Sequence, residues 1–193
     1  MPRTPAGARH ARTAVRCLVL LVLATAGAVV TPPVAAAGTA EALAACENSG
    51  SADFVQHVEV HGNSGGSVPA GSNPSNILLD GDVFLILGGE SAYPRVQVGP
   101  LPWDGSYGPT GNGLAAPVGW PFPGLNQYSA VLRFNNDPTG WVGHPTAVHP
   151  FGRCTVWHGP PVRLLFGVND TNVGDNNGMW WFTFFQYFPE NHG

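Results

Sequence analysis

The segment from Phe166 to Phe188 constrains the fold of this chain more than any other segment. Both of its ends are apolar runs rich in aromatic and β-branched residues, which suit pleated strands and are too short for stable helices. Between them lie six oxygen-bearing side chains within eight positions, together with Gly174 and the following Gly178: Asp170, Thr171, Asn172, Asp175, Asn176 and Asn177. The segment therefore predicts a strand, a polar loop and a second strand.

The polar loop carries the ligands that calcium prefers. Ca²⁺ takes about 6–8 oxygens from carboxylates, amides and backbone carbonyls, so we predict a calcium site here. The alternative is an ordinary turn, since Asn, Asp and Gly dominate turns for conformational reasons. The loop is not an EF-hand, because Asp175 stands where that motif requires Gly and Trp181 stands where it requires Glu.

The N-terminus has the features of a secretory signal peptide. Four arginines precede an apolar run from Cys17 to Val30, and the small residues from Val34 to Ala37 follow. We predict a signal peptide over residues 1–37, cleaved near Ala37, and therefore a secreted protein. The apolar run is too short to be a transmembrane span. We expect residues 38–52 to form a loose lead-in and residues 53–193 to form a single domain.

The charge of the exported part excludes some partners. Four of the eight basic residues precede the cleavage point, all twelve acidic residues follow it, and the protein contains no lysine. Such a surface disfavours nucleic acid and anionic membranes, and it favours a bound divalent cation.

Two cysteines remain after cleavage, and they allow two interpretations. An exported domain with Cys46 and Cys154 most simply pairs them in a disulfide. The alternative is a lipid anchor at Cys46, because Leu43 to Cys46 has the form of a bacterial lipobox. Glu41 and two prolines separate that cysteine from the hydrophobic run, which argues against the anchor.

The rest of the chain predicts strands. Phe54 to His61 alternates, with Phe54, Val58 and Val60 expected to face the core. Further strands are expected near Val83 to Leu87, Tyr93 to Val98, Tyr128 to Phe134, Val162 to Val168 and Met179 to Phe188. Residues 99–126 form a long irregular excursion. No amphipathic helix is visible, so we predict an all-β sandwich of two sheets.

Motifs for catalysis lack their usual context. Gly62 to Gly66 matches the G-x-S-x-G pattern around Ser64, but no helical pattern follows it. His57, Glu59 and His61 share one face of a strand, and we interpret them as a solvated face. We therefore predict that the protein is not an enzyme.

Several fragments together resemble a known family. In their order and separation, these fragments resemble the signature of the LecA-type calcium-dependent galactophilic lectins of bacteria. They are Gly81-Asp82-Val83, Gly88 or Gly89, Ser91-Ala92-Tyr93, Gly99-Pro100, Gly167 to Asp170 and Asp175 to Gly178. The resemblance spans about residues 54–188. It implies a jelly-roll-like β-sandwich in which two hydroxyls of the sugar bind the calcium directly.

The resemblance also implies which residues form the site. The calcium ligands would be Tyr93 through its carbonyl, Asp170, a carbonyl near Asn172, Asp175 and Asn176. The sugar would contact Tyr93, Asp170, Thr171 and Asn176. The family's sugar-binding His and Gln have no counterpart between Trp103 and Pro117, so we expect Trp103 and Tyr107 to take their place.

Two functions follow from these expectations. The first is a secreted, non-catalytic, calcium-dependent protein that binds galactose or a galactose-containing glycan. The second is a calcium-stabilised β-sandwich that binds another protein and no sugar. Weak single-site lectins gain avidity from self-association, and the last strand is apolar on both faces, so a homo-oligomer is expected.

Overall fold

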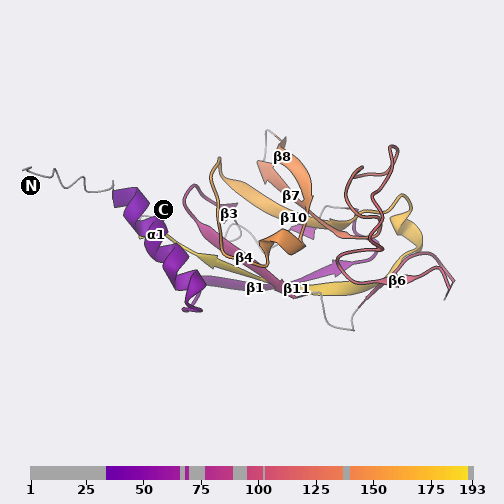
Figure 1. Cartoon of the computed structure of the whole chain (residues 1–193), viewed down its shortest axis with the longest axis horizontal. Helices are drawn as coiled ribbons and strands as arrows, with labels where there is room; N and C mark the ends of the chain where they lie inside the picture. Colours follow the sequence, from indigo (N-terminus) through magenta and orange to yellow (C-terminus); the bar gives the residue numbers. More distant parts are fainter. Residues whose placement is uncertain are drawn as a thin grey trace, which may run out of the picture. The chain divides into compact units, whose positions relative to one another are not determined.

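The computed structural model describes residues 34–65, 68–69, 77–88, 95–101, 103–136 and 140–190. These residues form two antiparallel sheets, one helix and two short 3₁₀ segments (Figure 1). The prediction of an all-β, two-sheet sandwich is therefore confirmed. No helix in these ranges is long and apolar enough to cross a membrane.

The first sheet is built around the last strand of the chain. Its strands are β1 (Phe54–His61), β4 (Val83–Gly88), β5 (Val96–Gln97), β6 (Ser106–Tyr107), β9 (Thr155–Val156) and β11 (Asn177–Tyr187). They follow the order β6-β5-β11-β4-β9. β1 pairs over its whole length with the edge of β11 opposite β4, from the pair Phe54–Gln186 to the pair His61–Met179. β11 thus lies inside the sheet, as its apolar sequence predicts.

The second sheet packs over the first. Its strands are β2 (Val68–Pro69), β3 (Ile77–Leu78), β7 (Ala130–Asn136), β8 (Gly140–Ala147) and β10 (Val162–Val168). The order is β2-β10-β7-β8, with β3 also paired to β10. Segments η1 (His149–Phe151) and η2 (Val173–Asp175) lie in the connections.

Alternating side chains of both sheets form one core. β11 contributes Trp180, Phe182 and Phe184, which are at most 3% exposed, and β10 contributes Leu164 and Phe166, which are fully buried. Each such side chain stabilises the fold by about 1.5–3 kcal/mol relative to an exposed one. The alternation predicted for β1 is confirmed: Val58 and Val60 are buried, whereas His57, Glu59 and His61 are exposed.

Helix α1 (Val34–Glu47) corrects the sequence interpretation, in which residues 38–52 were a loose lead-in. Its apolar residues are mostly alanines without a helical period, so no amphipathic pattern revealed it. α1 packs Ala42 and Cys46 beside Val83 and Tyr187. It therefore covers one end of the outer face of β11, while Trp181 at the other end remains 56% exposed.

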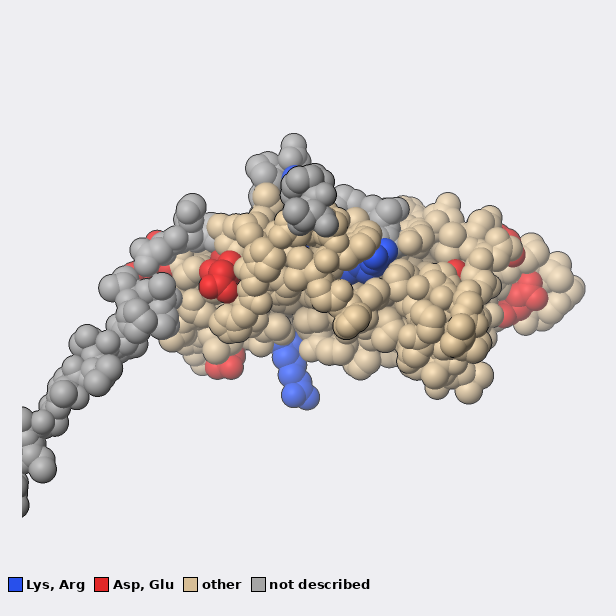
Figure 2. Space-filling view, turned by 90° about the horizontal axis from the view of Figure 1, so that it is seen from above, with Lys and Arg blue, Asp and Glu red and all other residues tan. Residues whose placement is uncertain are grey.

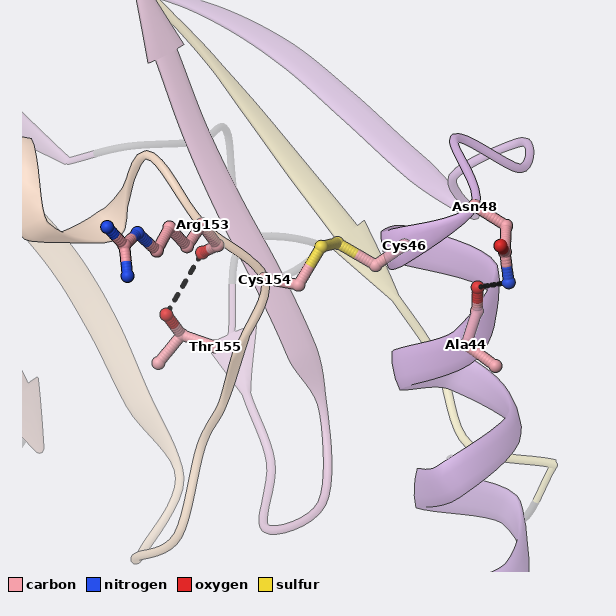
Figure 3. Close-up of a disulfide and its surroundings, with 6 residues drawn as sticks. All are labelled: Ala44, Cys46, Asn48, Arg153, Cys154 and Thr155. Atoms are coloured by element: carbon pink, nitrogen blue, oxygen red, sulfur yellow. Dashed lines mark hydrogen bonds between the residues drawn. A yellow bond between two sulfur atoms is a disulfide. The ribbon is translucent and has the colours of Figure 1, made fainter.

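The predicted disulfide joins α1 to the sandwich. Cys46 is bonded to Cys154, just before β9, with Cα atoms 6.0 Å apart (Figure 3). A sulfur in a disulfide cannot also carry a lipid, so the structure decides against the lipid anchor at Cys46. The segment expected to be cleaved lies almost wholly outside the described residues, and α1 begins at Val34, before the expected cleavage point.

Other strand predictions were confirmed in part. β10 has the predicted bounds, and β4, β7 and β11 differ from theirs by a few residues. β8 was missed, because Gly140, Gly143 and Pro145 interrupt any alternating pattern. Of the strand predicted over residues 93–98, the structure forms only β5, and Tyr93 lies outside the described residues.

Candidate functional site

The polar loop between β10 and β11 borders a cavity of about 330 Å³. Three separate parts of the chain meet there: the turn after β5, the residue Tyr128 before β7, and the polar loop itself. The lining residues are Val98, Gly99, Pro100, Asp104, Tyr128, Asp170, Thr171, Asn172 and Asp175. We call this the acidic cavity.

Among the described residues, three carboxylates and no basic side chain line the acidic cavity. They belong to Asp104, Asp170 and Asp175, and Asp170 is only 7% exposed. Figure 2 shows acidic side chains, and no basic ones, at the end of the molecule that carries β6 in Figure 1. Because like charges repel in a partly buried site, this arrangement favours a bound cation.

Asn172 holds two of the carboxylates in place. Its backbone N–H donates to Asp170 Oδ1 over 3.1 Å, and its side-chain amide donates to Asp175 Oδ2 over 2.6 Å. The first contact closes a tight Asx-type turn. The polar loop is therefore ordered by its own side chains, and one oxygen of each carboxylate remains without a hydrogen bond from a described residue.

The third carboxylate comes from the turn that follows β5. Asp104 Oδ2 accepts a hydrogen bond from the Leu101 N–H over 2.8 Å, and this carboxylate lies against Gly99. Gly99 has φ of +81°, and a Cβ added there would lie 2.6 Å from Asp104 Oδ2. Only glycine fits this position without moving the carboxylate.

Asn176 ties the turn to the polar loop instead of facing the cavity. Its Oδ1 accepts from the Gly99 N–H over 3.2 Å, and its Nδ2 donates to the Gly62 carbonyl over 3.0 Å. The side chain is 7% exposed. Its role in the structure is to fix Gly99, and hence Asp104, beside the polar loop.

Tyr128 forms the aromatic wall of the acidic cavity. Its ring stacks on Tyr107 at 5.2 Å between centroids and meets Trp120 edge to face at 5.3 Å. Burial, followed by the negative charges of Asp170, Tyr107, Asp104 and Asp175, raises the pKa of Tyr128 above its ordinary value. The residue has φ of +59°, a strained conformation for a bulky side chain.

The buried side chain of Asn169 positions Tyr128. Asn169 Nδ2 donates to the carbonyls of Phe122, Leu125 and Asn126, and its backbone carbonyl accepts from the Tyr128 N–H over 2.8 Å. The irregular excursion is thereby held to the end of β10. The hydrogen bond between Asn169 and Tyr128 places Tyr128 in the same cavity as Asp170.

The oxygen atoms of the acidic cavity fit a hard cation such as Ca²⁺ if neutral oxygens complete the coordination shell beside the carboxylates. In the described part of the chain, no group of three or more His, Cys, Asp and Glu side chains is arranged to hold a metal ion. Calcium commonly completes its shell with amide, carbonyl and hydroxyl oxygens. Asn172 and Thr171 supply such oxygens beside Asp170 and Asp175.

The structure brings together some predicted site residues and not others. Asp170, Thr171, Asn172 and Asp175 line the cavity. Asn176 is turned away from it, Tyr107 supports the ring of Tyr128, and Trp103 is 76% exposed and does not line it. Tyr93 lies outside the described residues.

Sequence reasoning missed Asp104 and Tyr128. The pair Asp104-Gly105 is a common turn signal, so the turn was detectable, but its position beside Asp170 was not. No local pattern marks Tyr128.

Comparison with known proteins assigns no family to the chain. No protein-family model matches it, and no curated protein matches it as a relative.

Proposed function

We propose that the protein is a secreted, calcium-dependent carbohydrate-binding protein whose ligand is galactose or a galactose-containing glycan. The observation that carries the proposal is the acidic cavity, where Asp104, Asp170 and Asp175 share one space with the ring of Tyr128. Secretion is supported by the N-terminal sequence and by the Cys46–Cys154 disulfide, which persists in oxidising compartments.

The charges support calcium as the first ligand. Asp170 and Asp175 would neutralise the ion, and Asn172 and Thr171 offer neutral oxygens close to them. In the part of the chain that the structure describes, no arginine or histidine lines the cavity to compete for these carboxylates, and the protein contains no lysine. When bound, calcium supplies open coordination positions that accept sugar hydroxyls.

The wall of the cavity supports a sugar as the second ligand. A sugar ring has polar edges and an apolar face, which an aromatic ring contacts well. Tyr128 provides such a ring, and its stacking on Tyr107 holds it in place. The volume of about 330 Å³ falls within the range of about 300–1,000 Å³ that is usual for small-molecule sites.

A second candidate function is a calcium-stabilised module that binds another protein. The observation that favours it is the exposure of apolar side chains on the irregular excursion, since Trp103 is 76% exposed, Leu114 62% and Val118 96%. Exposed apolar side chains mark interaction surfaces where they are contiguous in space. In this case calcium would raise the melting temperature while galactose would not bind.

The test is a calorimetric titration of galactose into the mature domain, once with calcium and once with a chelator, beside a melting curve with calcium alone. Galactose binding that requires calcium is the expected result. Asp175→Asn should abolish the calcium effect, whereas Glu59→Gln, an exposed carboxylate on β1 that does not line the cavity, should leave it unchanged. If calcium shifts neither melting nor binding, the proposal is wrong.

A further inference from the structure

A second cavity, of about 430 Å³, lies beside the open edge of β4. β4 pairs with β9 only at Val83 and Phe84. Towards Gly88, its side away from β11 has no strand partner among the described residues. The cavity shares no lining residue with the acidic cavity. We call it the edge cavity.

The inner wall of the edge cavity is apolar. Ile86 of β4, Phe182 of β11 and Val148 before η1 border it, and each is 3% exposed. These are core side chains that reach the cavity where the two sheets separate. A ligand with an apolar body would bury surface against them, which is favourable in proportion to the area removed from water.

The mouth of the edge cavity is basic. Arg153 and His149 line it, and no acidic side chain among the described residues does. The Arg153 carbonyl accepts a hydrogen bond from Thr155 Oγ1 over 3.0 Å, but its guanidinium makes no hydrogen bond or ion pair with another described residue. Figure 3 shows this side chain extending away from the disulfide, with only its carbonyl bonded.

The segment that carries Arg153 is fixed on both sides. Before it, Phe151 packs on Phe84 and Phe134 with centroids 5.3 and 5.9 Å apart. After it, Cys154 is bonded to Cys46 of α1. Because the backbone at Arg153 is anchored on both sides, only the side chain of this arginine has to be ordered when it binds a partner, and this limits the entropic cost of binding.

We propose that the edge cavity binds a small organic anion with an apolar body, such as an aliphatic carboxylate. The carboxylate would pair with the guanidinium of Arg153, which remains charged at all physiological pH values and bonds carboxylates with two parallel N–H groups. His149 also lines the cavity, and the apolar body would contact Ile86, Val148 and Phe182. This site requires neither calcium nor a sugar.

The probes that test this proposal are octanoate, acetate and 1-octanol, titrated in the presence of EDTA. Octanoate has both the charge and the apolar body, and each of the other two has one of them. Amide shifts in ¹H–¹⁵N spectra locate the ligand, and Gly152 and Thr110 at the cavity should respond. We expect octanoate to bind at least about 10-fold more tightly than either partial probe.

Two variants separate the edge cavity from unspecific binding. Arg153→Gln should weaken octanoate about 10-fold or more and leave 1-octanol unchanged, since a hydrogen bond to a charged group is lost. Arg163→Gln removes an arginine of β10 that does not line the cavity, and it should change neither ligand. Equal octanoate binding by Arg153→Gln and the unmodified protein, or no saturation by about 10 mM octanoate, would overturn the proposal.

Discussion

Asn169 and Phe122 bond to each other in both directions. Asn169 Oδ1 accepts from the Phe122 N–H over 3.1 Å, and Asn169 Nδ2 donates to the Phe122 carbonyl over 3.0 Å. The amide side chain thus pairs with the backbone of the excursion as a neighbouring strand would. Since Asn169 is fully buried and directly precedes Asp170, this pair sets the position of the acidic cavity.

Replacing Asn169 should therefore destabilise the fold strongly. Asn169→Ala leaves the buried N–H and carbonyl groups of the excursion without their partner, and we expect a loss of about 2–4 kcal/mol in the free energy of unfolding, measured with urea. The control is Asn126→Ala, which removes one exposed hydrogen bond to the Thr110 carbonyl and should cost less than about 1 kcal/mol. Equal losses of unfolding free energy in the two variants would show that the Asn169 side chain does not hold the excursion to the end of β10.

A pair of glycines should separate backbone strain from a clash with the carboxylate. Gly99 and Gly113 have nearly equal φ values, +81° and +79°, but a Cβ at Gly113 would meet nothing within 4 Å. Gly113→Ala should cost about 1–2 kcal/mol from backbone strain alone. Gly99→Ala should cost more, because its Cβ would lie 2.6 Å from Asp104 Oδ2.

The excess cost at Gly99 should depend on Asp104. In an Asp104→Gly background, Gly99→Ala should fall to about the cost of Gly113→Ala, because the carboxylate and the Cβ of Asp104, which lies 2.9 Å from the added Cβ, are both gone. Urea unfolding of the four variants measures this difference. An unchanged cost in that background would place the clash elsewhere in the turn.

Stability should decline at alkaline pH through Tyr128. Its pKa is raised in the folded protein, so the neutral phenol is favoured by folding. The resulting stability is present below the ordinary tyrosine pKa of about 10 and is lost as the pH rises through the folded value. Tyr128→Phe should remove this part of the alkaline decline.

Phenolate absorbance near 295 nm reports the same group directly. The difference between the titrations of the unmodified protein and of Tyr128→Phe isolates Tyr128, and Asp175→Asn should lower its pKa because one of the negative charges that raise it is removed. Calcium, if it binds between Asp170 and Asp175, should lower that pKa as well. An Asp175→Asn titration identical to that of the unmodified protein would show that Asp175 does not contribute to the raised pKa of Tyr128.

Reduction of the disulfide should release α1. The pair closes a loop with a sequence separation of 108, and its loss should cost about 3–5 kcal/mol. A helix of 14 residues is marginal in water without tertiary contacts. In the Cys46→Ser, Cys154→Ser double variant, amides of α1 should therefore exchange with solvent faster than those of β11.

The control for this variant is the unmodified protein under oxidising conditions. Amides of β10 lie in the core and should keep most of their protection in both proteins, because their exchange requires wider unfolding. If the amides of α1 remain as protected as before, packing of Ala42 on Val83 and Tyr187 holds the helix without the disulfide.

The sequence alone determined most of the long strands and the polar loop, although it did not reveal β8. Alternation in β1 and the largely apolar runs of β4, β10 and β11 are local patterns that mark a strand. The content of Asn, Asp and Gly from Asp170 to Gly178 likewise predicts a loop. The two-sheet sandwich followed from these local signals. The two cysteines of the exported part allowed the Cys46–Cys154 pair as one of two interpretations, and the structure forms that pair.

Only the tertiary structure decided which residues share the acidic cavity. Asp104 lies in the irregular excursion and Tyr128 lies just before β7, and Asn169 and Asn176 bring them to Asp170 through hydrogen bonds across the fold. α1 likewise had no pattern of its own, because its stability comes from the disulfide and from packing on β11. Long-range contacts of this kind depend on how the sheets bring distant segments together. The local periodicity of the sequence does not predict these contacts.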